Sequence, residues 1–170
     1  ADLIVKPSGL VSIDSVYRQG AGTSTIESGA TLIADSISIG SGSFLTCNGT
    51  VNSAIDMTNG SHLTGSGSIN GNVVCSGSIS PGGVPGKLTI NGNLTLADSS
   101  ICEFEISGTT PVTQYDKLAV NGNVVLNGAC SVTYVNLFEP IVGDTFKVID
   151  YSSHSGAFDK LQGADTSLIG

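Results

Sequence analysis

Apolar and polar residues alternate along much of this chain, in short runs that end at turn-forming residues. Residues 102–106 read CEFEI, so the cysteine, phenylalanine and isoleucine fall on one side and Glu103 and Glu105 on the other. A period of two is typical of β-strands, and the Gly, Asn, Asp and Ser residues that interrupt the runs are typical of turns. No helical period of 3.6 residues is sustained, so the pattern predicts an all-β protein.

The chain also repeats itself. Residues 41–60 align with residues 59–78 at an offset of 18, which places Leu45 on Leu63. Upstream, residues 8–16 match residues 28–37 with one residue inserted. Downstream, the triplet Asn-Gly-Asn recurs at 70–72, 91–93 and 121–123, with spacings of 21 and 30 residues. Short strands in repeats of this length indicate stacked, nearly identical structural units.

These patterns together predict a single-stranded parallel β-helix, or β-solenoid, with coils of about 18–30 residues. We expect one domain over residues 1–170, in which residues 1–60 form the less distinctive coils. An immunoglobulin-like sandwich also contains short alternating strands, but it does not explain the offset of 18, so we place it second.

The composition fits a thin, layered β structure and restricts the partners. Charged residues make up 12% of the chain, well below the usual quarter, and there is no Trp. The net charge of −8 disfavours nucleic acid, which needs clustered Lys and Arg, and also anionic lipid. Because no apolar run approaches the length of a membrane-spanning helix, we expect no membrane insertion.

Residues 61–160 carry several distinctive phrases in order. They are Ser80-Pro81-Gly82 with Pro85-Gly86, then Tyr115-Asp116-Lys117-Leu118, then Gly143-Asp144-Thr145-Phe146. Over about 100 residues these phrases resemble the β-helical passenger repeats of bacterial autotransporters and related surface proteins. The resemblance implies a secreted or surface-exposed protein whose β-helix is mainly a structural stalk. Four cysteines are a departure from that family, whose passengers tend to avoid them.

Residues able to carry chemistry are few and scattered, so we expect no catalytic, cofactor or metal site and no enzyme activity. The sole arginine is Arg18. Glu103 and Glu105 share a face, but strand alternation already explains both as solvated side chains. His62 and His154 are far apart in sequence with no nearby partner, which favours surface or turn roles.

The sequence leaves two other functions to consider, a polysaccharide-active enzyme and an ice-binding protein. A groove that unites acidic residues with Lys87 or Lys117 would favour a β-helical enzyme acting on polysaccharide. An ice-binding face would need ranks of threonine. Thr46, Thr64 and Thr95 are too few for that, and we expect them not to be arrayed.

The four cysteines are an even number, which is compatible with disulfides in an oxidising compartment. Aligning the coils puts Cys102 and Cys130 at the same inward position of adjacent coils, with Cα atoms about 5 Å apart. We therefore predict a structural disulfide or thiol stack between them. Cys75 takes a different inward position, level with Leu96, and its pairing and that of Cys47 stay open.

Both ends of the chain lack the polar cap that a solenoid needs, since residues 2–5 and 166–170 are short and apolar. We therefore expect self-association through the ends, which can give a head-to-tail filament. The predicted function is that of a non-enzymatic, secreted or cell-surface structural module. It is adhesin-like, and the sequence identifies no carbohydrate or cell-surface ligand. The alternatives are a stalk fragment of a larger autotransporter adhesin and the polysaccharide-active enzyme.

Overall fold

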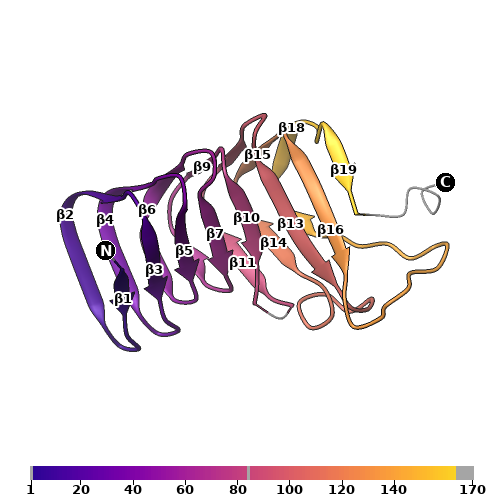
Figure 1. Cartoon of the computed structure of the whole chain (residues 1–170), viewed down its shortest axis with the longest axis horizontal. Coiled ribbons are helices and arrows are strands. Elements are labelled where there is room, and N and C mark those ends of the chain that lie inside the picture. Colours follow the sequence, from indigo (N-terminus) through magenta and orange to yellow (C-terminus); the bar gives the residue numbers. More distant parts are fainter. Residues whose placement is uncertain (1, 84, 164–170) are drawn as a thin grey trace.

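The computed structural model describes residues 2–83 and 85–163. Every regular element in this part of the chain is a β-strand, and every pairing between named strands is parallel (Figure 1). The all-β prediction and the parallel pairing are therefore confirmed. Among these residues there is no helix long and apolar enough to cross a bilayer. The predicted apolar segment at 166–170 lies outside the described residues.

The strands form two curled sheets, and the chain visits the two sheets alternately. Sheet A has eight strands: β1 (Leu3–Val5), β3 (Gly22–Ile26), β5 (Ser43–Cys47), β7 (His62–Gly65), β10 (Ser78–Pro81), β13 (Ile101–Ile106), β16 (Ala129–Tyr134) and β19 (Lys160–Gln162). Sheet B has eleven strands: β2 (Leu10–Gln19), β4 (Thr31–Ile39), β6 (Thr50–Met57), β8 (Ser68–Ile69), β9 (Val73–Cys75), β11 (Lys87–Ile90), β12 (Leu94–Leu96), β14 (Lys117–Val120), β15 (Asn123–Leu126), β17 (Ile149–Asp150) and β18 (Ser153–Gly156). We call one passage through A and then B a circuit.

The strand registers reproduce the sequence repeats. Leu45 of β5 lies beside Leu63 of β7, and Val51 of β6 lies beside Ile69 of β8, as the offset of 18 predicts. Side chains that alternate inward from the two sheets form one continuous apolar cluster, which reaches from Val5 to Ile149. Because each inward residue lies against its counterpart in the next circuit, the repeat in sequence becomes a column in the core.

The Asn-Gly-Asn triplets form corners at which sheet B divides. The long strands β2, β4 and β6 continue through this position, whereas later circuits break there into two short strands. A side-chain ladder runs along the corner: Asn70 Nδ2 donates to Asn52 Oδ1 at 2.6 Å, and Asn91 Nδ2 donates to Asn70 Oδ1 at 2.7 Å. Asn121 continues the ladder with a 2.6 Å bond to Asn91.

The glycine of each triplet is required by the closeness of the preceding circuit. A Cβ placed on Gly92 would lie 2.4 Å from the carbonyl oxygen of Gly71, and one on Gly122 would lie 2.5 Å from that of Gly92. Real Cβ atoms do not approach backbone this closely, so only glycine allows the corners to stack. This contact explains why the triplet, and not merely a turn, recurs in the sequence.

The connection from sheet A to sheet B lengthens along the chain. It consists of residues 48–49 after β5, residues 107–116 after β13 and residues 135–148 after β16. The growth in repeat length after β5 is therefore concentrated at one corner. In the earlier circuits, the pairs β2–β4 and β4–β6 each shift register once, between Ile13 and Val16 and between Ile33 and Ser36.

Candidate functional site

The N-terminal end of the two sheets is open. Within the described residues, β1 pairs only with β3, and β2 pairs only with β4. Inward-facing Leu3, Val11 and Ile13 are consequently only partly buried, although they pack against the core. The counterpart of Val11 in the next circuit, Leu32, is completely buried. The first circuit thus exposes an apolar surface that a further layer of chain would cover.

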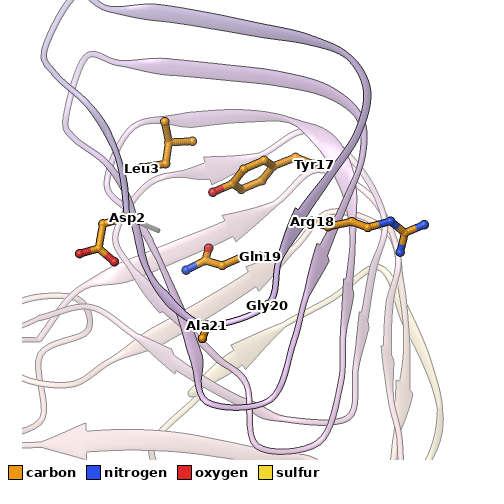
Figure 2. A pocket seen from close by; sticks show the side chains of 7 residues that line it. All are labelled: Asp2, Leu3, Tyr17, Arg18, Gln19, Gly20 and Ala21. Atoms are coloured by element: carbon orange, nitrogen blue, oxygen red, sulfur yellow. The ribbon is translucent and has the colours of Figure 1, made fainter.

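A pocket of about 440 Å³ lies at one corner of this open end (Figure 2). The chain forms it where β2 ends, where the turn to β3 follows, and where β1 begins. Its lining consists of Asp2, Leu3, Tyr17, Arg18, Gln19, Gly20 and Ala21. In the close view, the Tyr17 ring and the Gln19 amide extend between these segments, and the Arg18 side chain extends from the opposite side of β2, away from them (Figure 2).

Gln19 gives the pocket an unusual polar wall. This side chain is 3% exposed, and its Nε2 donates to the carbonyl oxygens of Gly22 at 2.6 Å and Phe44 at 3.2 Å. Its Oε1 is buried and has no hydrogen-bond partner among the described residues. A buried acceptor without a donor is costly, by about 1–3 kcal/mol.

The neighbouring polar groups in the pocket wall are already fixed by the first circuits. Asp2 Oδ1 accepts a hydrogen bond from the Thr23 backbone N–H at 2.8 Å. The Tyr17 hydroxyl lies 2.7 Å from Ser24 Oγ. These bonds hold the pocket open in a defined shape, and they leave Gln19 Oε1 as its unsatisfied group.

The loop of residues 135–148 carries a second apolar surface. Leu137 is 100% exposed, Ile141 71% and Val142 80%. We call these three side chains the apolar tip. Asn136 and Leu137 both have left-handed backbone, with φ of 55° and 58°, which is strained for a side chain such as leucine.

This loop is ordered by its own contacts. Asp144 Oδ2 accepts a hydrogen bond from the Ile141 N–H at 3.0 Å, and the Asp144 N–H donates to the Ile141 carbonyl at 3.0 Å. Beneath the loop, the Phe146 ring packs edge-on against the rings of Tyr115 and Phe138, with ring centroids 5.5 Å and 6.1 Å apart, respectively. Within the segment Gly143–Phe146, Asp144 therefore closes the turn and Phe146 packs it against Tyr115 and Phe138, while the apolar tip stays in solvent.

The predicted alignment of Cys102 and Cys130 is confirmed, because the two residues are register partners in β13 and β16. Both are buried, with exposures of 0% and 6%. All four cysteines are free thiols in this structure, so the disulfide stays a prediction. Cys75 is level with Leu96, as expected.

Burial makes these thiols poor nucleophiles. It raises the pKa of Cys47 to about 12 and the pKa values of Cys75 and Cys130 to about 11. The pKa of Cys102 is also raised, first by burial and then by its proximity to Cys75 and Cys130. At neutral pH the side chains behave as small apolar core residues.

The acidic candidates are held apart from the lysines. Glu103 and Glu105 are exposed, as the alternation predicts. Glu105 shares a small pocket of about 100 Å³ with Asp116, and neither Lys87 nor Lys117 lines that pocket. Instead, Lys117 Nζ lies 2.8 Å from Asp150 Oδ2.

Asp116 is the functional-looking residue that sequence reasoning missed, although it belongs to the quoted Tyr-Asp-Lys-Leu phrase. Its Oδ1 accepts from the Gly86 N–H at 2.9 Å, and its Oδ2 accepts from the Glu105 N–H at 2.8 Å. Burial raises its pKa despite these two bonds. Because both oxygens bind backbone, Asp116 connects Gly86 to β13.

Two expectations about side-chain neighbours are wrong. His62 has close partners: its ring stacks on Phe44 with centroids 4.5 Å apart, and its Nδ1 lies 2.7 Å from Ser78 Oγ. The His154 ring lies against the Tyr151 ring, with centroids 4.8 Å apart. Phe44 and Ser78 lie in the neighbouring circuits, so they are far from His62 in sequence and were not recognised as its partners.

The threonines are also more ordered than expected. Thr46 lies between Thr25 and Thr64 in one outward column of sheet A, and Ser80 extends that column. Thr95 lies in sheet B. The expectation that these threonines are not arrayed is therefore wrong for Thr46 and Thr64, because the short circuits bring them into register.

The described residues contain no group of three or more His, Cys, Asp or Glu side chains placed to hold a metal ion. Comparisons with protein-family models, with curated proteins and with solved structures found no match.

Proposed function

We propose that this chain is a non-enzymatic, extracellular structural β-solenoid, a surface or adhesin-like module that associates through its ends. The solenoid is supported by the asparagine ladder, whose members are separated by 18, 21 and 30 residues and are hydrogen-bonded in sequence order. A single chain that returns to the same corner after each repeat accounts for this ladder and for the stacked glycines.

The observation that carries end-to-end association is the open N-terminal end. A parallel sheet is normally covered, since its edge presents unpaired N–H and C=O groups and its inward side chains are apolar. Here β1 and β2 have free edges in the described structure, and Leu3, Val11 and Ile13 remain partly exposed. Contact between this end and a different surface of a second copy is heterologous, and it gives a filament where the rotation does not close.

The extracellular setting rests on the resemblance of residues 61–160 to passenger repeats. The same resemblance keeps a stalk segment of a larger adhesin as the second candidate. A stalk would use the open end to continue the solenoid within one chain, whereas the first candidate uses it between copies. An enzyme is disfavoured because the pocket that holds Glu105 and Asp116 is small and Asp116 is committed to backbone.

The test is direct imaging and sedimentation of the purified chain over a range of concentrations. We expect the wild type to form elongated, concentration-dependent assemblies. Val11→Lys places a charge on the open end, where it cannot be covered by another copy, and should shift the chain to monomers. Val125→Lys is the matched control, because Val125 is 42% exposed in β15, away from that end. Short monodisperse rods of the wild type at every concentration would refute the proposal.

A further inference from the structure

We propose that Asn59 is a site of spontaneous deamidation, and that hydrogen bonds between and within circuits protect the other asparagines that precede a glycine. Asparagine is among the chemically labile residues. The chain has six Asn-Gly steps, at 48–49, 59–60, 70–71, 91–92, 121–122 and 127–128. This inference concerns a covalent modification and does not depend on the proposed end-to-end association.

The reaction is an attack within the chain that needs only base and water. The backbone nitrogen after the asparagine gives up its proton and attacks the side-chain carbon Cγ. A bond from this nitrogen to Cγ forms, the bond from Cγ to Nδ2 breaks, and Nδ2 takes up a proton and leaves as ammonia. Water then opens the succinimide ring at either carbonyl, which gives aspartate or isoaspartate. Glycine favours the attack because it has no Cβ to hinder the approach.

The Asn59–Gly60 step meets these requirements. It lies at the centre of the turn between β6 and β7, which the Ser61 N–H closes by donating to the Thr58 carbonyl at 3.1 Å. Asn59 and Gly60 are both exposed. Neither the Asn59 side chain nor the Gly60 N–H has a hydrogen-bond partner in the described part of the chain. The carboxamide can therefore approach the Gly60 nitrogen without first breaking a side-chain bond.

The corner asparagines are held by the ladder. Asn70 donates from Nδ2 to Asn52 and accepts at Oδ1 from Asn91, so both ends of its carboxamide are occupied. The Nδ2 atom of Asn91 is thereby bound, and that of Asn121 is bound to Asn91. The following glycines, such as Gly92, lie too close to the preceding circuit for the backbone to turn freely. These steps can react only after the corner opens.

The two remaining steps are held by other contacts. The nitrogen that would attack Asn48 belongs to Gly49, and its N–H donates to the Ile26 carbonyl at 3.0 Å. Asn127 donates from Nδ2, the leaving group, to Asp98 Oδ1. Each of these steps therefore lacks the freedom that the turn between β6 and β7 has.

The preceding circuit contains a matched turn without the reactive group. The Ser43 N–H donates to the Gly40 carbonyl at 3.1 Å, and Gly42 has a φ of 72°, close to the 77° of its counterpart in the next circuit. Ser41 occupies the position of Asn59 in this turn. Serine has no carboxamide, so Asn59→Ser should remove the reaction and keep the turn.

Isoaspartate would alter a point that the neighbouring circuits hold on both sides. It adds the Cβ of residue 59 to the main chain. The Gly60 carbonyl accepts from the Gly42 N–H at 2.8 Å, and the Ser61 carbonyl accepts from the Ser78 N–H at 2.9 Å. A longer main chain at this turn should weaken these bonds to the circuits before and after it.

The experiment incubates the purified chain in mildly alkaline buffer, folded and in urea, and quantifies each Asn-Gly step by peptide mass mapping. In the folded chain, Asn59 should convert at least about tenfold faster than Asn70 and Asn91, which require opening of the corner. In urea the steps should convert at similar rates. Asn59→Ser should abolish the main charge variant and leave the urea midpoint unchanged. Asn52→Ala, which frees Asn70 Nδ2, should speed conversion of Asn70 about threefold without affecting Asn59.

Three results would overturn the proposal. If Asn70 converts as fast as Asn59 in the folded chain, the ladder gives no protection. If Asn59 keeps its lead in urea, the local sequence sets the rate and the structure does not. If Asn59 stays intact while another step converts, the turn between β6 and β7 is not the reactive site. Each of these results leaves the end-to-end association standing, because Asn59 lies away from the open end.

Discussion

The stacked corners predict that a single methyl group at Gly92 will destabilise the protein. In the Gly92→Ala variant, the new Cβ would lie 2.4 Å from the Gly71 carbonyl oxygen, 2.6 Å from the Gly71 carbonyl carbon and 2.8 Å from Asn72 Oδ1. Two of these atoms belong to the Gly71 backbone, so a movement of the Asn72 side chain cannot relieve the contact. The two circuits must separate at this corner by several tenths of an ångström or more.

The expected cost has two parts. Forcing extra volume into a packed position costs about 1–3 kcal/mol, and we take about 2 kcal/mol here. Separation of the circuits also weakens two exposed hydrogen bonds, from Asn91 Nδ2 to Asn70 Oδ1 and from the Asn93 N–H to Asn72 Oδ1. At about 0.5 kcal/mol each, these bring the expected loss in the free energy of unfolding to about 3 kcal/mol.

Urea unfolding followed by circular dichroism measures this loss directly. Gly83→Ala is the control, because a Cβ on Gly83 meets no heavy atom within 4 Å. That variant should lie within about 0.5 kcal/mol of the wild type, or be slightly more stable. The argument from close circuits is refuted if Gly92→Ala unfolds at the wild-type urea concentration, or if Gly83→Ala loses as much stability as Gly92→Ala.

Three further predictions concern buried polar and sulfur groups. Asp116→Asn keeps the shape of the side chain, but its single amide oxygen can accept only one of the two backbone hydrogen bonds. It should therefore lower the free energy of unfolding by about 1–3 kcal/mol. Glu103→Gln, at an exposed position, should not lower it. Burial raises the pKa of Cys130 from 9.0 to about 11, so the wild type should lose stability between those pH values, and Cys130→Ala should lose less. Refolding in the presence of a low-molecular-weight disulfide, which reaches both thiols before they are buried, should join Cys102 to Cys130 and reduce the reagent to two thiols, and peptide mass mapping that finds both cysteines free would contradict it.

The alkaline prediction follows from the direction of the Cys130 pKa shift. The folded state holds the thiol proton up to about pH 11, whereas the unfolded chain releases it near 9.0. The stabilising effect is complete below the unfolded pKa and is lost as the pH rises through the folded value. Unfolding measured at neutral pH and at about pH 10 tests the sign, and a stability that increases over this range would contradict it.

The repeating part of the fold could be predicted because each repeated residue faces its own copy. Alternation identified the inward residues of β13, and the offset of 18 identified the pairing of β5 with β7. The equivalence of Cys102 and Cys130 followed from the same alignment. A strand register leaves a trace in sequence whenever one face is buried, since a slip by one residue would turn every side chain around.

The candidate site could not be predicted in the same way. The pocket joins Asp2, beside the start of β1, to Tyr17 and Gln19 at the end of β2, and no repeat marks that position. The structural role of Asp116 depends on its hydrogen bond with Gly86, which lies in the preceding circuit. The neighbours of His62 likewise came from the circuits before and after it.

The longest departure from the repeat carries the most exposed large apolar side chains. Apart from the register shifts of β2–β4 and β4–β6, strand pairs keep the same register from circuit to circuit. Later inserted residues therefore collect where sheet A passes to sheet B, and the connection grows from 48–49 to 135–148. An insertion at this corner does not disturb the stacked core, because only the strands pack against the next circuit. The longest insertion exposes Leu137, Ile141 and Val142 on an ordered support, although each exposed side chain gains nothing for folding. A stack that already buries its core retains such a surface at a cost to solubility, and grouped exposure of this kind is typical of an interaction surface.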